Sequence, residues 1–409
     1  MNAPAEDLRV AVVCDYSLAY LGGAQTALLQ EVAALSAQGT RVLVLSPSPP
    51  EVWTRVRPAE PVEHLQLPSA CTLPGLDLPV VRNTRRQRTR LSELFTRLDI
   101  TIVHLQSEFG LAAAAAAVAG ELQLPVVHTV HTFFWQAPDV GQPLLAAAVR
   151  GFHRVITRLP SSTARLSDKP ADSALRNMTL TMARNADLVL SPSAHQADRL
   201  RQAGLHQVAV LPNTVSYGSD AVGLTAVDGP LKIIWIGRCV PEKRILTFVR
   251  AATAALDIIG PDKINFTVVG DGPQLPEARA TAGDRGGISF LGRQDHDHVI
   301  RLLAESHLAA LTSYGFDNQP MTVVEAVRAL RGVLYCDPAL REGLEGPGIL
   351  APPDDAGLAA KLVELATDPA PVLAASQAAV EARIGFGPEH HAAELIKHYR
   401  RLLAGRGTP

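Results

Sequence analysis

The stretch IIWIGRCVPEKR, residues 233–244, carries the strongest local signal in the chain. It begins as an apolar run typical of a buried strand, turns at Gly237, and then brings Arg238, Lys243 and Arg244 close together. Strands that are apolar on both faces are typical of parallel sheets covered by helices on each side. Such sheets bind ligands beyond the carboxyl ends of their strands. The stretch therefore predicts an anion-binding turn in an α/β domain.

The same alternation of apolar runs and helix-like segments recurs on both sides of this stretch. It pauses at a polar, glycine-containing segment, residues 214–230, and then restarts. A chain of 409 residues is long for one core, and the alternation predicts two doubly wound, Rossmann-like α/β domains. The runs with strand character lie at 9–14, 41–46, 100–105, 125–130, 187–191, 207–212, 232–237, 265–272, 288–292, 307–313 and 332–336.

The domain boundaries follow from this restart. We expect an N-terminal domain at 1–214, a linker at 215–230, a C-terminal domain at 231–385 and a terminal helix at 386–409. The last segment has apolar and basic residues on different faces.

Composition excludes several classes of protein. A net charge of −2 argues against nucleic-acid binding. Glu6 and Asp7 stand where a signal peptide would carry positive charge, and the longest apolar stretch, 111–120, is too short to span a bilayer. The four cysteines lack the spacing of a metal clip and are expected to be reduced thiols. We therefore expect a cytoplasmic protein with no nucleic-acid partner.

Two turns in the N-terminal half are candidate ligand contacts. Gly22 and Gly23 directly precede a predicted helix, whose N-terminus can hold a phosphate; an ordinary loop is the alternative. His131 follows the strand at 125–130, where an imidazole can bind a sugar hydroxyl or carry a proton. His128 lies inside that strand and is expected to be a hydrogen-bonded core residue.

A further turn, SYGFDNQPMTVVEAVRAL at 313–330, combines polar residues with a helix start. Pro320 suits the first helical turn, and Asp317 stands before it. Glu325 lies inside the helix among apolar residues, so its carboxylate needs partners. Two ribose hydroxyls would satisfy it; a salt bridge within one domain is the alternative.

The order of GGAQ, HTFFW, GRCVPEK, GDGPQL and DNQPMTVVEA resembles that of the family 4 glycosyltransferases, retaining enzymes of the GT-B fold. The likeness runs from about residue 8 to about residue 400 and is strongest in the second half. The family's Glu-X7-Glu pattern reads here as Asp317 and Glu325, so the first side chain is one methylene shorter. The implied fold has two Rossmann-like domains facing across a cleft, with the C-terminal helix crossing back to the first domain.

The resemblance also implies roles for the residues. Arg238 and Lys243 would neutralise the donor's diphosphate, Asp317 would contact the transferred sugar, and Glu325 would hold the ribose. His131 would lie near the sugar's 6-hydroxyl and reacting carbon. The glycine loop would close over the phosphates, and Arg244 would have no phosphate role, since its family position is commonly glycine. The implied catalytic set is therefore His131, Arg238, Lys243 and Asp317, and the donor-binding set is Gly22, Gly23, Gly237, Arg238, Lys243, Asp317, Asn318, Gln319, Pro320, Met321, Thr322 and Glu325.

The expected activity is transfer of a hexose from GDP-mannose or a UDP-hexose to an acceptor hydroxyl on a lipid, glycan or small molecule. The family needs no catalytic metal, and we expect no metal site and no cofactor. Two alternatives are a nucleotide-sugar epimerase of the same fold and a non-catalytic sugar-nucleotide binding protein.

One basic segment bears on the acceptor. Residues 81–95 include Arg82, Arg85, Arg86, Arg88 and Arg90. A basic helix of this kind can rest on the anionic inner face of a membrane, which predicts a peripheral protein; a solvated surface helix is the alternative.

Overall fold

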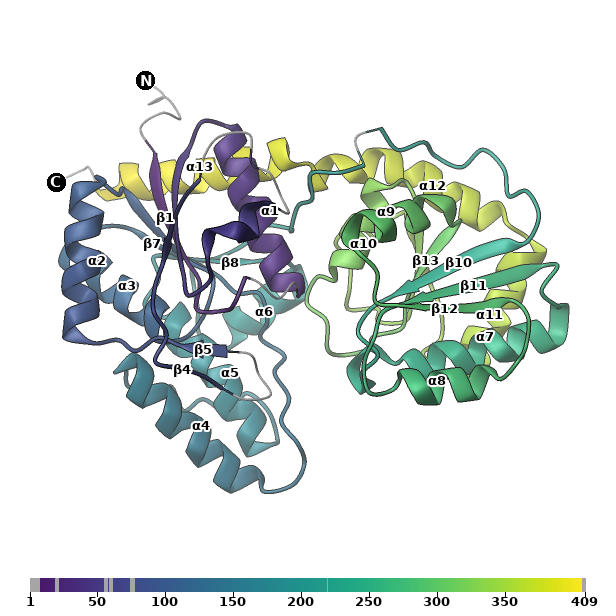
Figure 1. Cartoon of the computed structure of the whole chain (residues 1–409), viewed down its shortest axis with the longest axis horizontal. Coiled ribbons are helices and arrows are strands. Elements are labelled where there is room, and N and C mark those ends of the chain that lie inside the picture. The colour runs from purple at the N-terminus through teal and green to yellow at the C-terminus, as the bar shows by residue number, and fades with distance from the viewer. Residues whose placement is uncertain are drawn as a thin grey trace. The chain divides into compact units, whose positions relative to one another are not determined.

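The computed structural model describes residues 8–18, 22–54, 58, 62–73, 78–218 and 220–406. The chain folds as two compact units, of which the first comprises Met1–Thr214 with Pro388–Pro409 and the second Val215–Gly387 (Figure 1). None of the helices in the described residues is long and apolar enough to cross a membrane.

The described part of the first unit contains a seven-stranded parallel sheet with the order β3-β2-β1-β6-β7-β8-β9. Its strands are β1 (Arg9–Val13), β2 (Arg41–Ser46), β3 (Glu63–Gln66), β6 (Ile102–Leu105), β7 (Val126–Thr129), β8 (Leu188–Ser191) and β9 (Val208–Val210). A separate antiparallel pair joins β4 (Cys71–Leu73) to β5 (Leu78–Val80). The helices are α1 (Gly23–Ala37), α2 (Arg85–Arg97), α3 (Gly110–Glu121), α4 (Gln142–Thr157), α5 (Pro170–Ala183), α6 (Ala194–Gln202) and α13 (Pro388–Arg406).

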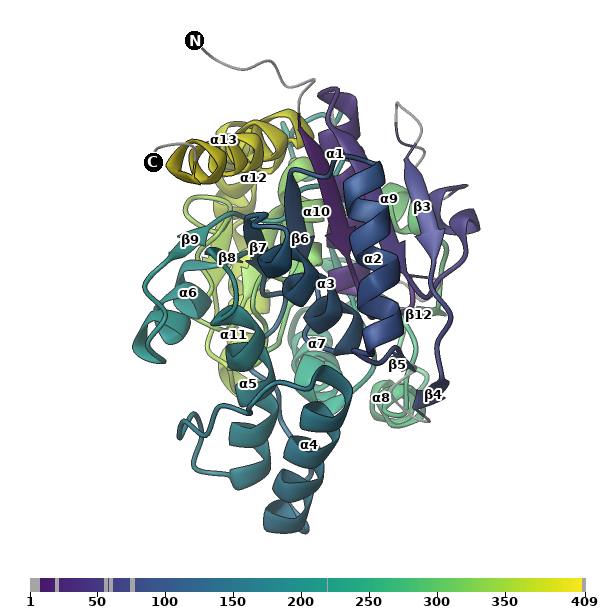
Figure 2. The same ribbon diagram turned by 90° about the vertical axis from the view of Figure 1, so that its left-hand side faces the viewer.

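The alternation of side chains along β1 assigns helices to the two faces of this sheet. Val10 and Val12 pack in one cluster with α1 and α13, whereas Ala11 and Val13 pack with α2 and α3. Figure 2 shows α2 and α3 lying together on one side of the unit. Because both faces are covered, β1 is apolar at every position after Arg9.

The described part of the second unit contains a six-stranded parallel sheet with the order β12-β11-β10-β13-β14-β15. Ile233 and Trp235 of β10 pack with α7 and α11, and Ile234 packs with α9 and α10. The strands are β10 (Leu231–Ile236), β11 (Ile264–Val269), β12 (Ile288–Gly292), β13 (Leu308–Leu311), β14 (Gly332–Tyr335) and β15 (Gly348–Leu350), and the helices are α7 (Ile245–Ile259), α8 (Leu275–Ala282), α9 (His296–Glu305), α10 (Met321–Arg328), α11 (Asp355–Thr367) and α12 (Ala370–Ala382).

The predicted fold class of two doubly wound sheets is confirmed, and each predicted run contains most or all of one observed strand. The terminal helix is also confirmed: α13 packs against α1 of the first unit. The segment 215–230, which was predicted to be a linker between the domains, belongs to the second unit. Val215 is fully buried there, and the Leu224 N–H donates to the Ser376 hydroxyl at 2.8 Å.

Candidate active site

The second sheet reverses its strand order between β10 and β13. The carboxyl ends of these two neighbouring strands lie side by side, so residues 237–244 and 312–320 meet at one edge of the sheet. This reversal point is where open α/β sheets bind ligands. The stretch that opened the sequence analysis and the stretch at 313–330 are therefore brought together.

Glycines let the turn after β11 pack directly on the turn after β10. Gly270 has φ +139°, and a Cβ there would lie 1.8 Å from the Gly237 carbonyl oxygen. Gly272 has φ +150°, and its Cβ would lie 2.6 Å from the Cys239 carbonyl oxygen. The Cys239 N–H donates to the Asp271 carbonyl at 2.8 Å, which joins the two turns. The backbone of the GDGP motif thus packs against the turn that bears Arg238 and supports it. The Arg238 side chain itself is exposed.

Lys243 and Asp317 form an ion pair, with Nζ 2.5 Å from Oδ1. The Lys243 side chain is 20% exposed and that of Asp317 is 8% exposed. Thr312, at the end of β13, holds the lysine's backbone: its hydroxyl donates to the Lys243 carbonyl at 2.9 Å and accepts from Trp235 Nε1 at 3.0 Å. The sequence predicted both residues for the site but not their pairing.

Arg244 has a structural role. It takes the left-handed conformation, with φ +53°, as the N-cap of α7. Its guanidinium donates to the carbonyl oxygens of Thr312, at 3.3 Å, and Pro353. Glycine takes positive φ more easily than other residues. The backbone conformation of Arg244 therefore explains why glycine is common at this position of the family.

The turn before α10 buries a run of polar side chains. Asp317, Asn318 and Gln319 are each 7–8% exposed. The helix begins at Met321 and Thr322 follows within its first turn, so Pro320 is the N-cap and not, as predicted, part of that turn. Its ψ of 128° is extended, which ends the turn before the helix starts.

Glu325 lies within α10 and is 7% exposed. Burial raises the pKa of its carboxyl, and His296 and the Tyr217 hydroxyl act in the opposite direction. His296, in the same unit, is the charged neighbour of this carboxylate. The carboxylate is held in a desolvated place beside the turn that carries Asp317.

His131 lies two residues beyond β7, in the first unit. Its Nε2 is 2.6 Å from Oε1 of Gln106, which follows β6. Burial lowers the pKa of the His131 imidazole to about 4, the Glu31 carboxylate acts against this, and His104 adds to it. The ring is therefore neutral near pH 7 and is fixed by its Gln106 contact.

His128 is fully buried, as predicted for a core residue. Its expected hydrogen bonding is wrong, however, because neither ring nitrogen has a partner among the described residues. Burial lowers its pKa to about 3, so the ring stays neutral and packs as an apolar group.

Gly22 and Gly23 mark the start of α1, as predicted. Gly22 is the N-cap, with φ −102° and ψ 177°, and Gly23 is the first helical residue. Gly22 is thus in extended backbone, and the N-terminus of α1 has no acidic side chain in its first turn. This end of the helix retains the partial positive charge that favours anions.

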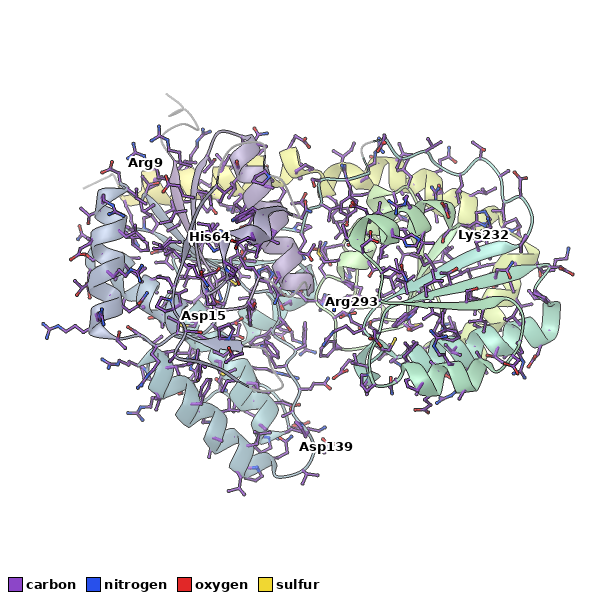
Figure 3. The ribbon with its side chains drawn as sticks, viewed as in Figure 1. Arg9, Asp15, His64, Asp139, Lys232 and Arg293 are labelled. Carbon is purple, nitrogen blue, oxygen red and sulfur yellow. The ribbon has the colours of Figure 1, made fainter. Side chains whose placement is uncertain are left out.

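Sequence reasoning missed two carboxyl groups at the reversal point of the first sheet. Asp15, labelled in Figure 3, follows β1 and accepts from Leu111 N at 2.7 Å and Ser107 Oγ at 2.8 Å. Glu108 accepts from the Tyr16 hydroxyl at 2.7 Å. Burial raises the pKa of Asp15 to about 6 and that of Glu108 to about 7. An aspartate two residues after β1, together with a second polar turn at 106–108, was the signal available.

The described residues contain no group of three His, Cys, Asp or Glu side chains placed to hold a metal ion. Cys14, Cys239 and Cys336 are buried free thiols, and Cys71 is exposed.

Two family models match this chain. Residues 21–217 match the model described as Glycosyltransferase Family 4, and residues 230–368 match that described as Glycosyl transferases group 1. The chain is a family 4 glycosyltransferase of the GT-B fold. This glycosyltransferase is 25% identical over 387 residues to phosphatidyl-myo-inositol mannosyltransferase of Mycolicibacterium smegmatis, an alignment that covers 88% of this chain and 85% of the relative.

Two other similarities widen the picture. The glycosyltransferase is 27% identical over 319 residues to 2-deoxystreptamine glucosyltransferase of Streptomyces kanamyceticus, covering 75% of this chain and 78% of the relative. Its fold resembles that of Anabaena HepE, solved in complex with UDP and glucose, with a TM-score of 0.67 and 16% identity over 96% of this chain and 100% of that one. At that identity the likeness shows the fold alone.

Proposed function

We propose that this glycosyltransferase is a retaining enzyme that moves a hexose from a nucleoside-diphosphate sugar to an acceptor hydroxyl. The observation that carries the proposal is the ion pair of Lys243 with Asp317 at the reversal point of the second sheet, between the turn that bears Arg238 and the helix that bears Glu325. Cations suit a diphosphate, and a buried carboxylate suits vicinal hydroxyls.

The chemistry follows from the charges. Breaking the bond between the sugar and the phosphate builds negative charge on the diphosphate and positive charge on the anomeric carbon. Arg238 and Lys243 stabilise the first, and the Asp317 carboxylate contacts the hydroxyls of the transferred sugar. Removing one such preorganised group typically costs about 2.7–4 kcal/mol of transition-state stabilisation. We propose that these protein cations carry the charge without a metal ion, and that the departing phosphate oxygen takes the acceptor's proton.

Asp317 holds Lys243 in the position from which it serves the donor. The pair is partly buried, so the lysine keeps one orientation without exposing an unpaired charge. When a diphosphate arrives, its oxygens compete for Nζ, and Asp317 is released toward the sugar. His131 of the first unit supplies a neutral imidazole for the transferred sugar, and Gly22 and Gly23 supply backbone N–H groups for the phosphates.

The donor is GDP-mannose or a UDP-hexose. The name of the mycobacterial relative supports mannose and a lipid acceptor. The name of the Streptomyces relative supports glucose and a small-molecule acceptor. HepE was solved with UDP and glucose.

We further propose that the first unit contacts anionic membrane. In α2 the apolar Leu91, Leu94 and Phe95 face the core, so the arginines predicted for this contact point outward except Arg88, which is half-buried and lies 3.8 Å from Glu121. Asn83 joins this helix to α4, donating from its amide to the Thr157 carbonyl at 2.7 Å.

Helix α4 and the turn before it also carry exposed apolar side chains. Val140 is 88% exposed, Leu144 is 80% exposed and Val155 is 57% exposed. Arg154 and Arg158 are exposed near Val155, at the end of the helix. Exposed apolar residues flanked by basic ones are typical of helices that lie in the membrane interface.

Membrane contact is tested by co-sedimentation with phosphatidylglycerol vesicles at low salt. Wild-type protein is expected in the pellet and the double variant Leu144→Gln/Val155→Gln in the supernatant. Ile258→Gln is the matched control, since Ile258 is 65% exposed in the second unit. If the wild-type protein stays in the supernatant, the proposed membrane contact is wrong. That result would leave the proposed sugar transfer unaffected.

Incubation with UDP- and GDP-hexoses tests the activity. Release of UDP or GDP that depends on an added acceptor supports transfer, and a product of retained anomeric configuration supports the retaining mechanism. An epimerised donor, or binding without turnover, overturns it.

A further inference from the structure

A buried polar network surrounds Gln106 in the first unit. It joins Glu31 of α1, His104 of β6, and His391 and Tyr399 of α13. Each of these residues, Gln106 included, is at most 5% exposed. The network borders His131 through the Gln106 amide.

We infer that Gln106 and Glu31 are positioning residues that fix His131 as the tautomer with its proton on Nε2, and that α13 completes their support. The inference rests on the proposed role of His131 in sugar transfer. It assigns a function in the site to residues that touch neither donor nor acceptor.

The orientation of the Gln106 amide follows from Glu31. Gln106 Nε2 lies 2.7 Å from Oε1 of Glu31. An ionised carboxylate only accepts hydrogen bonds, so the amide nitrogen must be the atom facing it. The Gln106 carbonyl oxygen is then on the side of His131.

The tautomer of His131 follows in turn. Gln106 Oε1 lies 2.6 Å from Nε2 of His131. An amide oxygen only accepts, so Nε2 must carry the proton. Because burial keeps the ring neutral, Nδ1 is the acceptor atom of the imidazole. A substrate hydroxyl that meets Nδ1 therefore donates to it, which favours a sugar with a hydroxyl at that place.

The carboxylate of Glu31 is itself held by α13. His391 Nδ1 lies 2.8 Å from the Pro212 carbonyl, and Nε2 lies 3.2 Å from Oε2 of Glu31. Through His391 the last helix thus reaches the Glu31 carboxylate. Burial alone would raise the pKa of Glu31, but His104 and His391 bring it below its usual range.

His104 closes the network. Its Nδ1 lies 2.6 Å from the Tyr399 hydroxyl and 3.3 Å from Oε1 of Glu31, and its Nε2 lies 2.7 Å from the Thr129 hydroxyl. Burial lowers the pKa of His104, the Glu31 carboxylate acts against this, and His391 adds to it. Tyr399 and His391 thus place two residues of the last helix against the support of His131.

The first test is a ¹⁵N spectrum of the full chain with labelled histidine, in which His131→Gln assigns the His131 signals by their loss. The expected result is a protonated Nε2 and an unprotonated Nδ1 near pH 7. A protonated Nδ1 in the wild-type protein overturns the inference. This measurement needs no turnover. Its outcome is therefore independent of the proposed activity, which would fail if no donor supported transfer.

The second test is Gln106→Met, which keeps the length of the side chain and removes both hydrogen bonds. We expect kcat to fall about ten- to a hundredfold, with the KM for the donor unchanged and a mixture of His131 tautomers. Unchanged kcat overturns the inference.

The contribution of α13 is tested by His391→Gln and Tyr399→Phe against His390→Gln, the neighbouring exposed histidine of the same helix. The first two are expected to lower kcat and alter the His131 signals, whereas the control leaves both unchanged. If all three behave alike, α13 has no part in positioning.

Discussion

Nζ of Lys243 lies 2.5 Å from Oδ1 of Asp317, so a cation assigned to the leaving group and a carboxylate assigned to the sugar neutralise each other. Binding of a diphosphate must therefore compete with an existing ion pair. Variants of the two residues are expected to change nucleotide affinity in opposite directions.

Lys243→Ala is expected to weaken binding of UDP or GDP by about ten- to a hundredfold, the usual loss for a hydrogen bond to a charged group, and to abolish measurable transfer. Calorimetric titration and a transfer assay provide the measurement, with circular dichroism to show that the fold is kept. Lys232→Ala, an exposed lysine labelled in Figure 3, is the matched control. Near-normal turnover by Lys243→Ala would sink the site assignment.

Asp317→Asn is expected to tighten binding of the free nucleoside diphosphate, because Lys243 loses its competitor. The same variant is expected to lower kcat about ten- to a hundredfold through the lost sugar contact. Asp317→Glu restores the residue of the family pattern and should keep both the ion pair and transfer. Weaker nucleotide binding by Asp317→Asn would show that Asp317 does not compete with the diphosphate.

Donor affinity should depend on the ionisation of Glu325. Burial raises its pKa, and only the ionised form accepts two ribose hydroxyls. Affinity is expected to fall as the pH is lowered through this raised pKa, at higher pH than for an ordinary glutamate. Glu325→Gln should bind more weakly near pH 8 and show no such fall. Parallel pH profiles for wild type and variant, measured by titration with GDP and UDP, would rule out the ribose role.

Glu108→Gln is expected to stabilise the protein at high pH. Burial raises the folded-state pKa of Glu108 to about 7 from an ordinary 4.5. The folded state therefore holds this proton more tightly than the unfolded state, and wild-type stability is lost as the pH rises from about 4.5 to about 7. The variant keeps an acceptor for Tyr16 and lacks this loss, so its advantage should reach the order of 2 kcal/mol near pH 8 and vanish near pH 4. The free energies of unfolding of wild type and variant, measured by chemical denaturation at the two pH values, test this prediction. An equal difference between the two proteins at both pH values would contradict the raised pKa.

Arg244→Ala should destabilise more than Arg244→Gly, by about 1 kcal/mol, because alanine keeps the unfavourable positive φ while glycine relieves it. Both lose the hydrogen bonds to Thr312 and Pro353. Neither is expected to change nucleotide affinity, and a loss of affinity in both would return Arg244 to the phosphate site.

The sequence predicted the layers well because parallel strands covered on both faces must be apolar throughout. It missed the edge strands β3 and β15, which are only three or four residues long and partly exposed. It also took 215–230 for a linker, since its polar composition does not reveal that Val215 and Leu224 pack on the second unit.

The sequence indicated the turns that follow strands, where ligands of open α/β sheets bind. Arg238, Lys243 and Asp317 could be placed because the reversal of strand order brings their turns together. The Lys243 and Asp317 ion pair and the Gln106 contact to His131 could not, because each depends on side-chain directions across elements far apart in sequence. Asp15 and Glu108 were missed because single carboxyl groups after strands are common, and only burial sets these two apart.

The chain leaves the first unit at Thr214 and returns to it at Pro388. During synthesis, β1 and α1 must therefore wait for the whole second unit before α13 can cover them with Leu395, Ile396 and Tyr399. The unit that is made first finishes folding last. A chain stopped after Gly387 would have a complete second unit and a first unit whose apolar face lies open to chaperones.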